Sequence, residues 1–222
     1  MILARLNTFV LLFLLVYPAD AAEKPREINW ENLVPEMPQL DNPFERLSTE
    51  QIIDFEMLMS IRSIQRNQDI SDAEKALEDG IEIRYKLERQ GLDVEGLIAD
   101  YERLEQEVVS RNLMTNQELD GEEIRIPGYA LPLETQGTGV KELLLVPYVG
   151  ACIHVPPPPA NQTVYVKLKE THTFKDVYEP VWITGRLSIK STNQTLSLVD
   201  GSAGVDTGYL LEGVKIEPYE EE

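Results

Sequence analysis

The chain has 222 residues and a formal charge of −19 at pH 7, from 39 acidic and 20 basic residues. Binding to nucleic acid or to anionic lipid depends on clusters of Lys and Arg, so this charge argues against both as partners. A single cysteine excludes an intramolecular disulfide, and the length suits one or two domains.

Residues 1–21 have the pattern of a secretory signal peptide. Arg5 precedes a continuous apolar stretch from Phe9 to Val16, and Ala19-Asp20-Ala21 supplies the small residues of a cleavage site. The apolar stretch is shorter than the roughly 20 residues that cross a bilayer. We therefore expect a cleaved signal peptide and a periplasmic mature chain without a transmembrane span. Retention of this segment as an N-terminal anchor is the alternative.

Residues 22–47 contain four prolines, which prevent one long helix. The segment is nevertheless rich in apolar residues, with Trp30 among them. We expect it to lie extended against a folded partner, most simply the rest of this chain.

Residues 48–112 have helical periodicity. Ser48 and Gln51 have the spacing of a capping box, Ser71 and Glu74 form a second one, and Asp93 is placed to cap a third helix. In the first helix the apolar residues recur three or four apart: Ile53, Met57, Ile61 and Ile64. The second and third helices carry matching apolar positions across a short connection, which predicts an antiparallel helical hairpin.

Residues 122–219 change to a two-residue period with β-branched and aromatic residues. Glycines within the pattern, Gly128 and Gly185, would let long strands bend. The predicted fold class is α+β, with a small five-stranded OB-like β-barrel after the helices and a β-sandwich as the alternative. The expected strands are 123–133, 141–148, 163–169, 177–189 and 208–216.

The stretch "VPYVGACIHVPPPPAN" (146–161) contains the residues best suited to chemistry. On a strand, Cys152 and His154 would point to the same face, where a thiolate and an imidazole could bind zinc or copper with His172 and Glu170. A nucleophilic pair of Cys152 and His154, oriented by Asn161, is a second reading that their spacing disfavours. A buried, inert thiol in the core is the third.

The four prolines of this stretch require a stiff polyproline segment, so strand pairing must end before them. We expect this segment to cross over and pack against Trp30 or Tyr148, with an exposed docking ridge as the alternative. Side chains of Asn161 and Gln162 could cap the proline turn. The prolines are Pro156, Pro157, Pro158 and Pro159.

Three stretches resemble a bacterial exported family, the domain-of-unknown-function 3299 family: "RIPGYALPLE" (125–134), "LLVPYVGACIHVPPPPANQTVYV" (144–166) and "YEPVWITGRL" (178–187). Trp30, Leu33 and Pro35 also match its W-x-x-L-x-P segment. The resemblance implies a small β-barrel domain and a gene neighbourhood of ABC-type transport components, some of them zinc-responsive. It implies no particular activity.

Together these observations predict an exported, non-enzymatic binding or accessory module that acts through an envelope protein partner, such as an ABC-type transport system. A periplasmic zinc or copper binding or delivery protein is the first alternative, and a thiol-dependent hydrolase the second. The expected organisation is a signal peptide (1–21), a proline-rich segment (22–47), a helical region (48–112) and an OB-like β-barrel domain (113–222).

Overall fold

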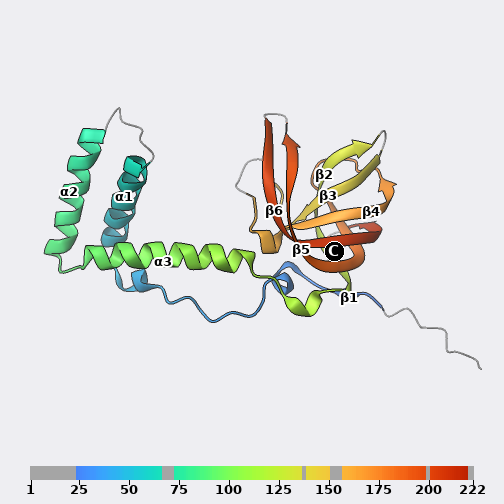
Figure 1. Cartoon of the computed structure of the whole chain (residues 1–222), viewed down its shortest axis with the longest axis horizontal. Coiled ribbons are helices and arrows are strands. Elements are labelled where there is room, and N and C mark those ends of the chain that lie inside the picture. Colours follow the sequence, from blue (N-terminus) through green and yellow to red (C-terminus); the bar gives the residue numbers. More distant parts are fainter. Residues whose placement is uncertain (1–23, 67–72, 137–138, 151–156, 199–200, 220–222) are drawn as a thin grey trace, which may run out of the picture.

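The computed structural model describes residues 24–66, 73–136, 139–150, 157–198 and 201–219. It has a mixed α+β fold with helices at one end and strands at the other (Figure 1). The helices are α1 (Thr49–Arg66), α2 (Ala73–Arg89) and α3 (Val94–Leu113). The strands are β1 (Arg26–Glu27), β2 (Glu123–Gln136), β3 (Gly139–Val146), β4 (Val164–His172), β5 (Glu179–Leu198) and β6 (Gly201–Pro218).

Helix starts follow the predicted local signals. The Ser48 N–H donates to Gln51 Oε1 over 2.9 Å, and the Gln51 N–H donates to Ser48 Oγ over 3.3 Å, which confirms the first capping box. The Asp93 carboxylate accepts from the Gly96 N–H at 3.0 Å and caps α3 as expected. Ser71 of the second capping box lies outside the described residues.

The antiparallel helix pair differs from the predicted one. Lys86 on α2 lies 2.8 Å from Glu50 and 2.7 Å from Asp54 on α1, so these two helices run side by side in opposite directions. Helix α3 crosses the pair and continues toward the strands (Figure 1). The predicted hairpin of α2 with α3 is therefore wrong. The chain changes direction in the short connection between them, so that α3 crosses α2 instead of running back along it. We call α1, α2 and the first half of α3 the helical lobe.

The apolar faces of the helices are only partly covered. Of the apolar residues expected on α1, Ile61 is buried whereas Ile53, Met57 and Ile64 are exposed. The helical lobe instead forms its core from other positions: Phe55, Leu58, Leu87, Val94, Leu97 and Ile98. On α3 only apolar residues of the first turns are buried, since the rest of the helix extends beyond α1 and α2: Val94, Leu97 and Ile98.

The strands form one sheet whose pairings close a ring. The strands β2, β3, β4, β6 and β5 are neighbours in that order, and β5 pairs again with β2. All of these pairings are antiparallel except β4 with β6, which is parallel. A single sheet does not support the β-sandwich alternative. We call the strands and the turns that connect them the sheet lobe.

Each of the five expected strands is present, and most of them are longer than predicted. The β5–β6 hairpin continues to the pair Leu198 and Gly201, through a polar stretch that the sequence pattern did not assign to strands. The short strand β1 was not predicted, and it pairs in parallel with the start of β2. Cross-strand hydrogen bonding therefore extends the sheet beyond its apolar pattern.

Residues 24–48 pack along both lobes, as expected for the proline-rich segment. Ile28 and Leu33 are buried in the core of the sheet lobe. The ring of Phe44 lies 5.3 Å from that of Phe55 and 6.3 Å from that of Tyr101, in the helical lobe. One continuous segment therefore contacts the cores of both lobes.

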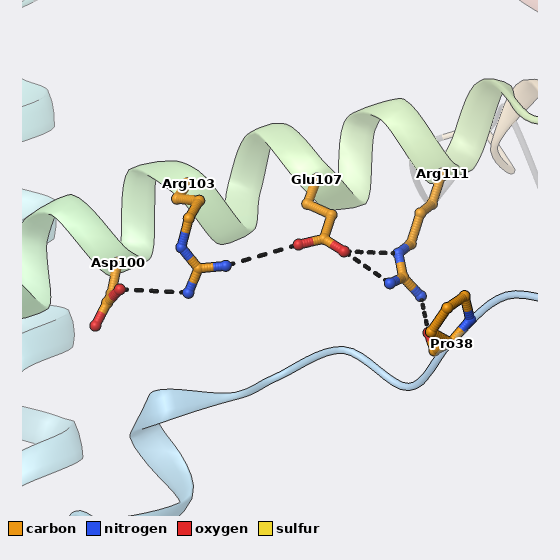
Figure 2. Close-up of polar contacts among 5 residues, drawn as sticks. All are labelled: Pro38, Asp100, Arg103, Glu107 and Arg111. Carbon is orange, nitrogen blue, oxygen red and sulfur yellow. Dashed lines mark hydrogen bonds and ion pairs between the residues drawn. The ribbon is translucent and has the colours of Figure 1, made fainter.

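Helix α3 and this segment are also joined by polar contacts (Figure 2). Arg111 donates to Glu107 over 2.7 Å and to the Pro38 carbonyl oxygen over 2.6 Å. Nearer the start of α3, Arg103 lies between Asp100 and Glu107 and forms ion pairs with both. The bond from Arg111 to Pro38 holds the segment against the part of α3 that links the lobes, and the other ion pairs lie within α3. No helix in the described ranges is long and apolar enough to cross a bilayer.

Candidate functional site

The stretch that the sequence singles out is described only from Pro157 onward. Cys152, His154 and Pro156 lie outside the described residues, so their predicted roles stay predictions. Pro157 is exposed, Pro158 is buried and Pro159 is half-buried. The turn η4 (Ala160–Gln162) follows directly and leads into β4.

Asn161 and Gln162 bind other elements rather than the proline turn. The buried Asn161 amide donates to the carbonyl oxygens of Arg111 and Met114, at 2.9 and 3.0 Å, where α3 ends. The last carbonyls of a helix have no partner within the helix, so this amide completes the C-terminus of α3. Gln162 donates to the Trp30 carbonyl oxygen at 3.4 Å. Both side chains therefore join the sheet lobe to segments far away in the sequence.

Tyr209 on β6 fixes the same junction from inside the sheet lobe. Its fully buried hydroxyl donates to the Leu33 carbonyl oxygen at 2.5 Å and accepts from the Asn116 N–H at 2.7 Å. Burial raises the pKa of Tyr209 above its ordinary value, although the bond from Asn116 acts in the opposite direction. The N-terminal segment, the end of α3 and the sheet are thus held together by buried hydrogen bonds.

Trp30 is placed by the turn η1 (Trp30–Leu33), which a reciprocal cap stabilises. Asn29 and Asn32 each accept from the other's N–H, at 3.1 and 2.9 Å. The indole then lies against Gly128 of β2. A Cβ added at Gly128 would lie 2.8 Å from both Trp30 Cζ2 and Leu145 Cγ, so only glycine permits this approach.

An aromatic groove opens beside Trp30 on the sheet lobe. Its volume is about 180 Å³, the size of one or two side chains. The lining consists of aromatic residues, prolines and one glycine: Trp30, Pro127, Gly128, Tyr129, Pro147, Pro180 and Tyr219. Tyr148 and Val149 follow Pro147 directly and are both exposed. We call this the aromatic groove, and exposed apolar residues of the stretch 146–161 continue from it.

Charged residues border the groove behind Tyr219. The Tyr219 ring lies 5.6 Å from the ring of Trp182, and the Arg125 guanidinium lies 3.9 Å from the centre of the Trp182 ring, a cation–π contact. Arg125 also pairs with Glu27 at 2.9 Å and with Glu217 at 3.5 Å. Lys215 and Arg125 lower the pKa of Glu217, which keeps this border ionised.

The other predicted metal ligands lie on a different part of the sheet lobe. Glu170 and His172, on β4, line a cleft of about 300 Å³ with Lys169 and Lys215. The His172 ring also contacts that of Phe174, with 4.6 Å between centres. Within the described ranges, no group of three or more His, Cys, Asp or Glu side chains could hold a metal ion. A metal site that includes Cys152 and His154 stays a prediction.

Comparison with known proteins identifies the family. A profile described as "Protein of unknown function (DUF3299)" matches residues 30–218. The chain belongs to the DUF3299 family. This confirms the resemblance carried by the three sequence stretches and Trp30.

One solved structure similar to this DUF3299 chain is that of a DUF3299 family protein from Pseudomonas aeruginosa PAO1. The two chains are 26% identical, with a TM-score of 0.48, over 90% of this chain and 99% of the other. No curated protein matches the sequence.

Of the residues that line the aromatic groove of this DUF3299 protein, the sequence pattern indicated Trp30 but not most of the others. Pro127 on β2 and Pro180 on β5 interrupt strand patterns, and proline inside a strand signals a position without a normal ladder bond. That signal could have indicated irregular hydrogen bonding between these two strands. Tyr219 follows the last strand and carries no comparable signal.

Proposed function

We propose that this DUF3299 protein is an exported, non-enzymatic binding module of the cell envelope that holds an extended protein segment in its aromatic groove. The aromatic groove carries the proposal. Proline-rich and extended segments bind to grooves lined by aromatic side chains, because such segments are already ordered before they bind. The volume fits one proline or one apolar side chain as an anchor.

Two further features support this function. The signal-peptide pattern of residues 1–21 favours export to the periplasm, and the charge of −19 disfavours nucleic acid as the ligand. The order of the ring and its parallel β4–β6 pairing fit an OB-like barrel, a scaffold that binds ligands through its surface. We therefore assign the partner to the proteins of the envelope, such as a component of an ABC-type transport system that offers an extended segment.

Tryptophan fluorescence provides a direct test, because the chain has only two tryptophans. Trp30 lines the aromatic groove, and Trp182 contacts Tyr219 at its border. A 12-residue proline-rich peptide should change the emission of the mature chain in a saturable way. The Trp182→Phe variant, which keeps Trp30 as the single reporter, should show the same midpoint. A peptide with glycine in place of proline is the control.

Absence of a saturable change up to about 1 mM peptide, weaker than most specific binding, would contradict the proposal. Photo-crosslinking in intact cells adds a second test. A photoreactive residue at Val149, beside the aromatic groove and 62% exposed, should give a discrete protein adduct. The same residue at Val109, 57% exposed on α3, should not. Identical adducts at both positions would argue against the groove.

A further inference from the structure

The outer face of α2 carries an exposed apolar stripe. Leu77, Ile81 and Tyr85 are four residues apart and therefore lie on one side of the helix. Their exposed fractions are 52%, 60% and 59%. The side of α2 that packs on α1 uses other positions, such as Gly80 beside Ile61. We call these three residues the α2 stripe.

Two acidic residues beside the α2 stripe have no partner among the described residues, whereas basic residues of the same helix form ion pairs within the lobe. Glu78 and Glu82 are exposed, and neither has a hydrogen bond or an ion pair in the part of the chain that the structure describes. Arg84 pairs with Glu88 and with Glu95 of α3, at 2.9 and 2.6 Å.

Lys86 points away from the stripe toward Glu50 and Asp54 of α1. The Arg89 guanidinium lies over the ring of Tyr85, with 5.0 Å to its centre. The border of the α2 stripe at Glu78 and Glu82 is therefore negative. Residues 49–113 as a whole contain 16 acidic against 8 basic residues, so the surrounding field has the same sign.

We propose that the α2 stripe is a docking surface for a basic amphipathic helix of a partner protein. A helix with apolar residues three or four apart could pack along Leu77, Ile81 and Tyr85. Lysine or arginine beside its apolar face would meet the unpaired carboxylates of Glu78 and Glu82, and this complementarity selects the partner and speeds association. The surface lies on the helical lobe and does not depend on the aromatic groove.

Other occupants fit the charge less well. Two copies joined antiparallel through this stripe would form a symmetric contact, in which each flank meets the same flank of the other copy. Glu78 and Glu82 of one copy would then face the same two residues of the other copy, and like charges repel. Anionic lipid surfaces are repelled by the same carboxylates.

Binding of designed peptides to the full chain tests the proposal. The probe is an 18-residue labelled helix with leucines on one face and lysines beside them, and its control has glutamates in place of the lysines. Fluorescence anisotropy at low salt should show binding of the lysine peptide about tenfold tighter than the glutamate peptide, a difference that shrinks as salt increases. The Glu78→Lys, Glu82→Lys double variant should reverse this order.

A matched control is available in the sheet lobe. Glu118 and Glu122 are exposed and also four residues apart, so Glu118→Lys with Glu122→Lys makes the same charge change elsewhere and should leave the order intact. Ile81→Ser should weaken the binding of the lysine peptide about tenfold. The circular dichroism spectrum should stay unchanged, since Ile81 is exposed. Tyr219→Ser, in the aromatic groove, should have no effect on this peptide.

Two results would overturn the inference. One is equal binding, or no binding, of both peptides to the unaltered chain. The other is a dimer of the unaltered chain in sedimentation equilibrium that Ile81→Ser dissociates, since this would assign the α2 stripe to a second copy. Failure of the proline-rich peptide at the aromatic groove would leave this surface unaffected, so the two proposals are tested separately.

Discussion

The two lobes bury their apolar residues in different ways. In the sheet lobe the strands close a ring, so each strand has a neighbour on both sides and the inward residues of β2 to β6 are almost fully buried. In the helical lobe α3 crosses the α1–α2 pair instead of running along it, so the three helices bury only a small core and several apolar residues stay at the surface. Closure therefore buries the inward face of the ring, whereas the open arrangement of the helices leaves apolar side chains at the surface.

The largest expected effect is in the sheet lobe, at Gly128. Because a Cβ there would overlap Trp30 and Leu145, Gly128→Ala should destabilise the protein and Gly128→Val should cost about 3 kcal/mol of unfolding free energy. The matched change in the helical lobe, Gly80→Ala, should be far milder, because its Cβ would come no closer than 3.3 Å to a side-chain atom, Ile61 Cγ2, and alanine gains helix propensity. Thermal and urea unfolding measure both variants. A normal melting temperature for Gly128→Val would contradict the packing of Trp30.

The next effect concerns the buried hydroxyl of Tyr209. Tyr209→Phe removes both of its hydrogen bonds and leaves the Leu33 carbonyl and the Asn116 N–H only the long 3.3 Å bond between them, at a cost of about 2 kcal/mol for the two lost bonds. Urea unfolding measures the loss. A cost below about 0.5 kcal/mol would show that water or a shifted backbone replaces these bonds.

Tyr209 also predicts an alkaline limit to stability. Its folded-state pKa is raised above the ordinary value of 10.0, mainly by burial. A raised pKa means that the contribution of the neutral hydroxyl is complete below about pH 10 and is lost as the pH rises through the raised value. Unfolding free energy should therefore fall in this range, and Tyr209→Phe should reduce that fall. If the unfolding free energies of the two proteins fall equally with pH, the ionisation of other groups causes the fall.

A smaller effect is expected at the contact between α3 and the sheet lobe. Asn161→Ala removes the amide that completes the end of α3 and should cost about 1.5 kcal/mol. Hydrogen exchange should then accelerate in the last turn of α3 more than in β3. Pro157→Ala is the control, because Pro157 is exposed and the change should be mild. Equal effects of the two substitutions would mean that Asn161 does not anchor the helix.

The smallest effect is expected at the surface of the helical lobe. The Lys86 side chain is half-buried, and hydrogen bonds with Asp54 and Glu50 raise its pKa. Solvent and salt screen such pairs, so Lys86→Met should change the urea midpoint little, and less at high salt. A large loss would show that these ion pairs, rather than Gly80 and Ile61, hold α1 against α2.

Local sequence signals predicted the elements well. Capping boxes and N-caps depend on residues within one turn, so Ser48, Gln51 and Asp93 identified two helix starts correctly. Alternation of side chains identified each of the five main strands, because the pleat alone sets that period. The proline content of residues 22–47 likewise required an extended segment, and its apolar residues required a partner.

Tertiary structure decided how these elements meet. The pairing of α2 with α1 rather than α3, and the direction of α3 toward the sheet, depend on contacts that no local period encodes. The aromatic groove likewise brings Trp30, Tyr129 and Tyr219 together from three distant stretches. Asn161 and Gln162 were identified from the sequence as capping residues, but the carbonyls they bind lie far away in the chain. Local interactions fix the elements, whereas closure of the ring and burial of distant side chains fix the site.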